Sequence, residues 1–319
     1  MTIPEVVTVG RVSVDLYGQQ EGASFVDPQT FAKSIGGSPT NVAVAAARLG
    51  HRAAIVTKVG EGALGDYVRH QLATWGVDTT YVGTGDGQTP VVLAALDPPE
   101  DPQIVFYRGD AAPDTQVTTS DVPTDVIRDC PVLWISFGAL AQGTTADTCQ
   151  DWLDLRDRRA EVVLDLDYRP SMWPDRDAAH DVALAAVRRS TIVVGNRVEC
   201  EVAIGETDPD RAADALLAEG VRLAIVKRGG DGVLLATQDQ RYTIPPLPID
   251  VLCGLGAGDA FGGALVHGLL QEWDIATIGE FANAAGALVV EQLTCADAMP
   301  EEAHVRAMMV QNGRAEGHS

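Results

Sequence analysis

Short apolar runs separated by helical patterns fill the chain from Pro131 onward. The runs are rich in Val, Ile and Leu, and the stretches between them repeat apolar residues at helical spacing. Strands that alternate with helices predict βαβ units and a parallel sheet that is buried on both faces. The predicted strands cover residues 132–136, 161–165, 191–195 and 223–227, and the predicted helices cover 145–159, 178–189 and 210–219.

The remaining patterns complete this sheet and add a smaller one. Residues 12–34, 90–96 and 103–107 have no helical period, and we interpret them as strands and turns of a small separate sheet. Two of the predicted helices, 42–50 and 64–75, end at or directly before a glycine. The other predicted strands are 6–9, 53–59 and a hairpin of 233–236 with 241–244, and the other helices are 42–50, 64–75, 260–270 and 278–293.

The sequence therefore predicts a single α/β domain over residues 1–310. A central, mostly parallel sheet is flanked by helices, and a small β-sheet lid is formed from about 12–34 and 90–110. Residues 311–319 read as a C-terminal tail.

Charge and cysteine usage narrow the class of protein. The 319 residues carry a formal net charge of −22, which disfavours nucleic acid or an anionic membrane surface as a partner. An anionic ligand would need cations concentrated locally. The five cysteines form no CxxC pair, and no signal peptide or membrane span is apparent, so we expect a cytoplasmic protein.

The stretch 254–263, GLGAGDAFGG, carries the clearest chemical signal. Glycines let a backbone approach a ligand closely, and a helix N-terminus attracts anions. Asp259 stands beside this anion site, where a carboxylate could take a proton from a hydroxyl that attacks a phosphate. The alternative is that Asp259 only caps the helix.

Further motifs follow the same strand-to-helix logic, and each has a structural alternative. Gly36, Gly37 and Asn41 precede the Ala-rich helix and read equally well as a helix start. Asn196 and Glu199 follow a strand in the spacing of a capping box. The turn from Lys227 to Gly232 is glycine-rich but is no Walker A loop.

Taken together and in this order, the motifs from about Val6 to Pro300 resemble those of the PfkB (ribokinase-like) carbohydrate kinases. The resemblance implies a ribokinase-like fold and ATP-dependent sugar phosphorylation. Asp259 would be the general base, in a loop with Gly256, Ala257 and Gly258. The sugar hydroxyls would meet Asp15, Gly36, Gly37 and Asn41. ATP would meet Asn196, Lys227, Gly229, Gly232 and Asn283, with Mg²⁺ held near Glu199, largely through water.

Two arginines narrow the substrate. Arg108 ends a predicted lid strand, and Arg169 follows the strand 161–165 in a segment that resembles the DxNxR motif of sugar-acid kinases. Asp167 stands where that motif has Asn. An arginine fork suits a carboxylate, so we expect a sugar acid as substrate. The alternative is that these arginines form surface ion pairs with Asp110 and Asp167.

Other functions compete with this interpretation. Within the fold, the enzyme could be a 2-keto-3-deoxygluconate kinase or resemble a fructokinase. A dinucleotide dehydrogenase is opposed by the spacing, because its third glycine would fall at Asp259. An inactive sugar-binding regulator is opposed by the presence of Asp259. The expected partners are a sugar acid and ATP, with no nucleic acid and no membrane, and a homodimer through the lid is compatible with the resemblance.

The sequence departs from many ribokinase relatives six residues before Asp259, where Cys253 replaces an Asp tied to a monovalent-cation site. A thiol is a poor ligand for a hard alkali cation. We therefore predict that replacing K⁺ by tetramethylammonium at constant ionic strength leaves the rate of phosphorylation unchanged. A several-fold fall in rate would show that a cation site exists without this carboxylate.

Overall fold

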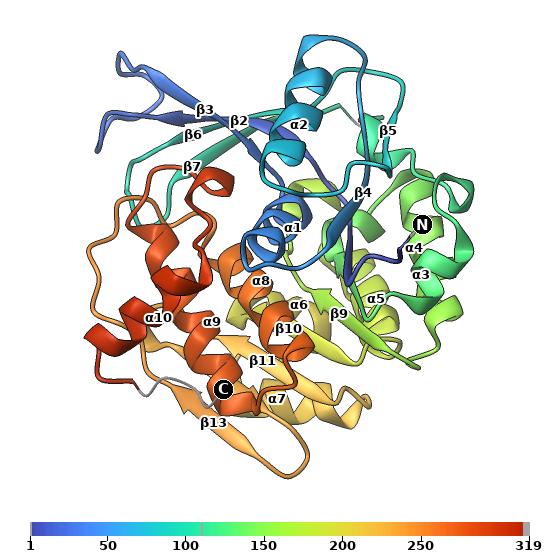
Figure 1. Cartoon of the computed structure of the whole chain (residues 1–319), viewed down its shortest axis with the longest axis vertical. Coiled ribbons are helices and arrows are strands. Elements are labelled where there is room, and N and C mark those ends of the chain that lie inside the picture. The colour runs from blue at the N-terminus through green and yellow to red at the C-terminus, as the bar shows by residue number, and fades with distance from the viewer. Residues whose placement is uncertain (1, 110, 315–319) are drawn as a thin grey trace.

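A nine-stranded sheet forms the centre of the molecule in the computed structural model, which describes residues 2–109 and 111–314 (Figure 1). The strand order is β13-β12-β11-β10-β9-β8-β1-β4-β5, and all neighbouring strands pair in parallel except β12, which runs antiparallel to both β11 and β13. The strands are β1 (Val6–Val9), β4 (Ala53–Val59), β5 (Val82–Thr84), β8 (Val132–Ser136), β9 (Glu161–Asp165), β10 (Ile192–Asn196), β11 (Leu223–Lys227), β12 (Val233–Ala236) and β13 (Arg241–Ile244).

Helices cover both faces of this sheet, because neighbouring strand residues point to opposite sides. Val6 and Val7 of β1, for example, are both fully buried but belong to two different hydrophobic clusters. On one face lie α1 (Ser38–Arg48), α2 (Ala63–Thr74), α8 (Ala257–Leu270), α9 (Ile275–Val290) and α10 (Glu302–Gln311). On the other lie α3 (Thr124–Asp129), α4 (Gly143–Arg156), α5 (Arg176–Val187), α6 (Arg197–Ile204) and α7 (Pro209–Ala218).

Short 3₁₀ turns connect several of these elements. They are η1 (Pro113–Thr115), η2 (Thr119–Asp121), η3 (Phe137–Leu140), η4 (Pro170–Met172), η5 (Gly229–Asp231) and η6 (Ala296–Ala298).

A smaller four-stranded sheet projects to one side of the main sheet, at the upper left in Figure 1. It consists of β2 (Ser13–Gly18), β3 (Phe31–Gly36), β6 (Val91–Ala95) and β7 (Gln103–Tyr107), in the order β3-β2-β6-β7. Its strands come from the segments in which the sequence predicts a small sheet. The chain therefore combines a large, mostly parallel sheet with a second sheet, as expected.

The strands of the parallel sheet were the most predictable elements, and the helix starts were the least. Seven predicted strands of the large sheet have the bounds that the sequence suggests, and β10 is shifted by one residue; the seven are β1, β4, β8, β9, β11, β12 and β13. In contrast, α1 begins at Ser38 rather than residue 42. Residues 38–41, which directly follow Gly36 and Gly37, therefore form the first turn of this helix. Likewise α8 begins at Ala257 rather than residue 260. The short elements β5, α3 and α10 were not predicted.

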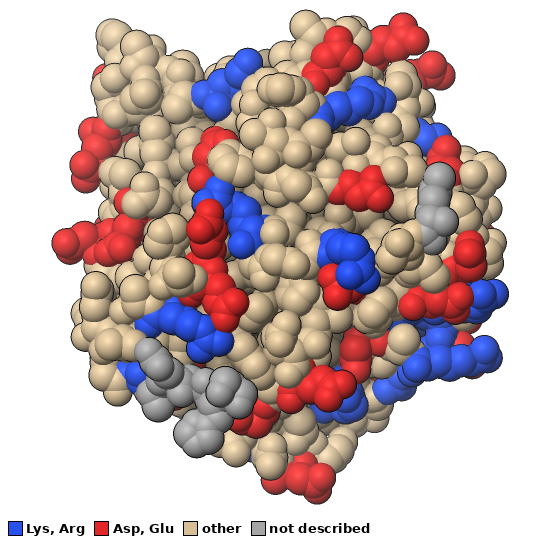
Figure 2. All heavy atoms as spheres, in the orientation of Figure 1, with Lys and Arg blue, Asp and Glu red and all other residues tan. Residues whose placement is uncertain are grey.

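The surface agrees with the composition. On the face in Figure 2, acidic and basic side chains are interspersed, and the residues described there form no extended basic area. Within residues 2–109 and 111–314, no helix combines the length and apolarity needed to cross a bilayer. Of the segments named above, Asp110 and residues 315–319 of the tail lie outside the described residues.

Candidate active site

Asp259 lies in the first turn of α8, and its carboxylate is held from a second helix. Gly256, with φ 83°, is the N-cap residue of α8. Asp259 is therefore the third helical residue, and the interpretation that it is itself the N-cap is wrong. Its Oδ2 accepts a hydrogen bond of 2.7 Å from Asn41 Nδ2, in the first turn of α1. The structure thus brings the predicted base, Asp259, next to Asn41, which is predicted to bind the sugar.

The surroundings of Asp259 suit a base that works near neutral pH. Burial raises the pKa of its carboxyl to about 6, and the charge of Asp167 adds to this, while the hydrogen bond from Asn41, the nearby Ser38 hydroxyl and the charge of Lys227 oppose it. A carboxyl with this pKa is mostly ionised at pH 7 and can still accept a proton efficiently.

Two glycines shape the turn from β3 into α1 beside Asp15. Asp15 lies on β2 and accepts hydrogen bonds from Ser13 Oγ at 2.5 Å and Tyr17 Oη at 3.1 Å. A Cβ at Gly36 would overlap the Asp15 carboxylate, and one at Gly37 would overlap the carbonyl of Arg11. Gly37 also has φ 99°, which favours glycine. The glycines therefore let Asp15 and the start of α1 come together.

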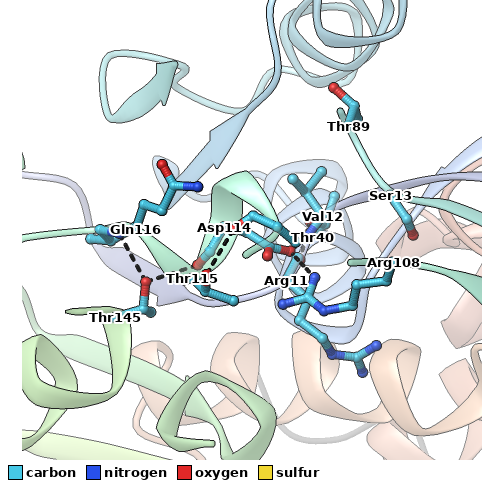
Figure 3. A network of polar contacts seen from close by, with 12 residues as sticks. Arg11, Val12, Ser13, Thr40, Thr89, Arg108, Asp114, Thr115, Gln116 and Thr145 are labelled. Atoms are coloured by element: carbon cyan, nitrogen blue, oxygen red, sulfur yellow. Dashed lines mark hydrogen bonds and ion pairs between the residues drawn. The ribbon is translucent and has the colours of Figure 1, made fainter. Parts of the chain in front are cut away.

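The two predicted carboxylate-binding arginines have different partners. Arg169 Nη2 lies 2.7 Å from Asp167 Oδ1 as an ion pair, and the Arg169 side chain is 41% exposed. Arg108 instead donates to Asp114 Oδ2 at 2.5 Å, next to the backbone N–H of Val12, as Figure 3 shows. The pairing of Arg169 with Asp167 agrees with the alternative considered for this residue, but half of the Arg169 side chain remains accessible to a ligand.

A cavity of about 770 Å³ opens on the other side of the α8 N-terminus. Its rim includes Ala257 and Gly258 from the catalytic loop, and much of its wall is apolar. Four of the residues predicted to bind ATP line it: Lys227, Gly229, Gly232 and Asn283. The fifth, Asn196, does not line it. Asn283 also donates from its amide to the Pro245 carbonyl at 3.0 Å, which fixes one wall of the cavity.

The smaller sheet reaches this cavity as well. The turn between β6 and β7 contributes Glu100 to the cavity lining. In the same turn the Pro99 carbonyl accepts a 2.8 Å hydrogen bond from Gly254 N, just before the catalytic loop. A Cβ at Gly254 would overlap the Glu100 carbonyl, so this contact requires glycine.

Lys227 connects the cavity with the buried carboxylates. Its Nζ lies 4.0 Å from Asp165 Oδ1 and close to Gly258. Burial alone would lower the pKa of Lys227, but the carboxylates of Glu199, Asp165 and Asp259 outweigh it and raise the pKa. Lys227 is therefore a permanent positive charge in the cavity wall, beside the start of α8.

Asn196 and Glu199 form the capping box that the sequence allowed. Asn196 Oδ1 accepts from Glu199 N at 3.0 Å, and Glu199 Oε2 accepts from Asn196 N at 2.6 Å. Within the described part of the chain, no group of three or more acidic, His or Cys side chains is gathered closely enough to bind a metal directly. Mg²⁺ keeps several waters when bound, so Glu199 acting largely through water fits this ion.

Four residues of the site were missed from the sequence: Arg11, Ser38, Asp114 and Asp165. Ser38 Oγ donates to Asp165 Oδ2 at 3.0 Å, and burial raises the pKa of Asp165. Arg11 Nη2 donates to Asp167 Oδ2 at 2.5 Å. Asp165 opens the segment that resembles the DxNxR motif and ends a parallel strand at the sheet edge where ligands bind, and Ser38 lies between Gly37 and Asn41, so both had a sequence signal. No local pattern marked Arg11 or Asp114.

Solved structures share this fold over almost the whole chain. A fructokinase from Xylella fastidiosa with bound ATP superposes with a TM-score of 0.85 at 22% identity, covering 98% of this chain and 100% of that one. A protein from E. coli assigned as a ribokinase II, in complex with ATP and Mg²⁺, gives 0.84 at 23% identity, with coverage of 96% and 99%. At such identities the two structures establish the fold.

Sequence relatives match over a similar length. The 5-dehydro-2-deoxygluconokinase of Clostridium tetani is 27% identical over 98% of this chain and 95% of its own length. The enzyme of the same name from Geobacillus kaustophilus is 29% identical over 97% and 95%. The sequence pattern of the pfkB family carbohydrate kinases matches residues 4–302. The protein is therefore a member of the pfkB family of carbohydrate kinases.

Proposed function

We propose that the protein transfers the terminal phosphoryl group of ATP to a hydroxyl of a sugar acid, with Asp259 as general base. The observation that carries the proposal is the position of Asp259. Its carboxylate is bonded to Asn41 on the sugar side, and the loop that precedes it lines the 770 Å³ cavity. A group at this junction can contact a hydroxyl while the phosphates of a nucleotide lie against the loop.

The chemistry follows from the charges. The oxygen of the sugar hydroxyl attacks the terminal phosphorus of ATP, and Asp259 accepts the proton of that hydroxyl. As the new bond forms, the bond between the phosphorus and the bridging oxygen of ADP breaks. Lys227 and the N–H groups at the start of α8 stabilise negative charge on the phosphates. Mg²⁺, when bound near Glu199, neutralises further phosphate charge.

Among sugar acids we propose 5-dehydro-2-deoxy-D-gluconate, phosphorylated at O6, as in myo-inositol catabolism. Several relatives at 27–29% identity carry the name 5-dehydro-2-deoxygluconokinase. The guanidinium groups beside Asp167 and Asp114 suit an anionic substrate. A coupled assay of ADP release against a panel of sugars and sugar acids tests this. Faster turnover of 2-keto-3-deoxygluconate or fructose would identify that compound as the substrate instead, and the proposal of kinase activity would stand.

We further propose that the smaller sheet is a lid over the sugar. Asp15 is on β2, Gly36 on β3, and Arg108 directly follows β7, so this sheet carries much of the proposed sugar side. Val105 and Tyr107 on β7 are exposed, which suits a homodimer formed through the lid. The whole of residues 1–310 would then act as one catalytic domain.

Replacing Asp259 by Asn should lower kcat by about 10²–10⁴-fold, the usual contribution of a positioned general base. The Kd for ATP, measured by calorimetry, should stay within a few-fold, because the loop backbone is unchanged. Asp274→Asn is the matched control, since it also changes a carboxylate in a helix N-terminal position and Asn caps a helix as well as Asp.

The pH profile tests the same assignment. Since the base acts as a carboxylate, wild-type kcat/KM should fall about tenfold per unit as pH decreases below about 6. The Asp259→Asn variant should lose this dependence. Near-wild-type kcat in that variant would remove Asp259 from the mechanism.

Glu199→Gln should raise the Mg²⁺ concentration required for half-maximal activity. Gln retains much of the capping function, so the melting temperature should change little. Glu201→Gln in the same helix, where Glu201 pairs with Arg176, is the control. An unchanged Mg²⁺ titration with a lower melting temperature would leave Glu199 with only a capping role.

Arg169→Met should reduce kcat/KM for the sugar acid by about one to two orders of magnitude, since a charge-assisted hydrogen bond contributes roughly 1.5–3 kcal/mol. The KM for ATP should change far less. Arg176→Met, which removes a surface ion pair, is the control. Equal efficiency of the wild type with a neutral ketose and any acid would assign Arg169 to a surface ion pair instead.

A further inference from the structure

Arg11 is a buried guanidinium on the proposed sugar side to which no role has been given. It follows Gly10 at the end of β1 and is 8% exposed. Nη2 donates to Asp167, but Nε is buried and has no acceptor among the described residues. Buried donors without an acceptor are costly. A ligand that supplies acceptor oxygens would remove this cost.

The contacts of Arg11 join it to the predicted sugar ligands. Asp167 Oδ2 accepts a hydrogen bond from Arg11, and Asp167 Oδ1 forms an ion pair with Arg169, so one carboxylate bridges two guanidinium groups. Burial raises the pKa of Asp15, and hydrogen bonds from Ser13 and Tyr17 and the charge of Arg11 oppose this, which places Arg11 within electrostatic reach of Asp15.

Arg11 also meets the smaller sheet. Its Cζ lies 5.9 Å from the ring centre of Phe106 on β7. Figure 3 shows its guanidinium together with that of Arg108, while Asp114 accepts both from Arg108 and from the backbone N–H of Val12. Arg11 thus lies where the smaller sheet, the end of β1 and the segment after β9 meet.

The pairing explains why residue 167 is Asp. Burial alone would raise the pKa of Asp167, but Arg169 and Arg11 lower it below its ordinary value, so it stays ionised. An Asn would leave the buried charge of Arg11 without a counter-charge, which is strongly unfavourable. Three guanidinium groups, of Arg11, Arg108 and Arg169, are paired with only the two carboxylates of Asp114 and Asp167.

We infer that Arg11 is a specificity-determining residue that binds the carboxylate of the sugar acid together with Arg169, with Asp167 holding the two guanidinium groups in place. This inference rests on the proposed function. Arg108, whose Nη1 pairs with the buried Asp114, orients the adjoining strand rather than providing the main charge for the substrate.

The test compares 5-dehydro-2-deoxy-D-gluconate with its C1 amide, which keeps the shape and removes the charge. The KM of the acid and the inhibition constant of the amide are measured for wild type and Arg11→Gln. Loss of one charge-assisted contact should reduce the preference for the acid roughly ten- to hundredfold, with the KM for ATP unchanged. A preference within twofold of wild type would overturn the inference.

A second variant separates recognition from folding. Arg11→Gln leaves Asp167 paired with Arg169, one carboxylate with one guanidinium, so the local charge stays balanced and the melting temperature should change little. If Arg11 binds the carboxylate, Arg11→Lys, which keeps the positive charge, should retain more of the preference for the acid than Arg11→Gln does. An equal loss of preference in both variants, together with an equal fall in melting temperature, would make Arg11 purely structural. A wild type without any preference for the acid would instead overturn the proposed sugar-acid function itself.

Discussion

The hydrogen bond between Asn41 and Asp259 depends on how closely α1 and α8 approach each other. Gly263 of α8 faces Ala45 of α1, and a Cβ at Gly263 would overlap the Ala45 side chain. At Gly262 a Cβ would lie 2.6 Å from the ring of Trp134 on β8. Small residues on both helices are therefore required for the 2.7 Å bond that joins the sugar side to the catalytic loop. The Ala-rich helix α1 and the glycine pair Gly262–Gly263 thus determine this geometry, although neither carries a chemical motif.

The site works against the overall charge of the chain. With −22 in total, the molecule disfavours anions at long range. Around the site, however, Lys227 lies at the cavity rim, and Arg11 and Arg169 share Asp167. Burial strengthens the interaction of these charges with a ligand, because water screens buried charges less. If the substrates are anionic, as proposed, a few residues within a short radius must provide the attraction that the overall charge does not.

The sequence predicted the fold well, and it placed the glycine-rich loop of Asp259 at a helix start, because both depend on local patterns. Parallel strands buried on both faces read as continuous apolar runs, and Gly256 to Asp259 form a contiguous motif. Sequence patterns did not predict contacts between residues that are far apart in the chain. Arg11 and Asp167 are separated by 156 positions, and Ser38 and Asp165 by 127, so only the register of β1, β8 and β9 brings them together. The starts of α1 and α8 were misplaced because Ser38, Pro39 and Gly258 have weak helix signals that tertiary packing overrides.

The turn between β6 and β7 joins the smaller sheet to the edge of the cavity. Pro99 is bonded to Gly254, and Glu100 borders the cavity, and both lie between two strands of the smaller sheet that carries Asp15. If the sugar and ATP bind where we propose, any displacement of the smaller sheet on sugar binding must also change the edge of the cavity. The two binding equilibria are then thermodynamically linked, and linkage is reciprocal: the factor by which the sugar alters ATP affinity equals the factor by which ATP alters sugar affinity. A single backbone hydrogen bond would thus let the protein favour the ternary complex over either binary one.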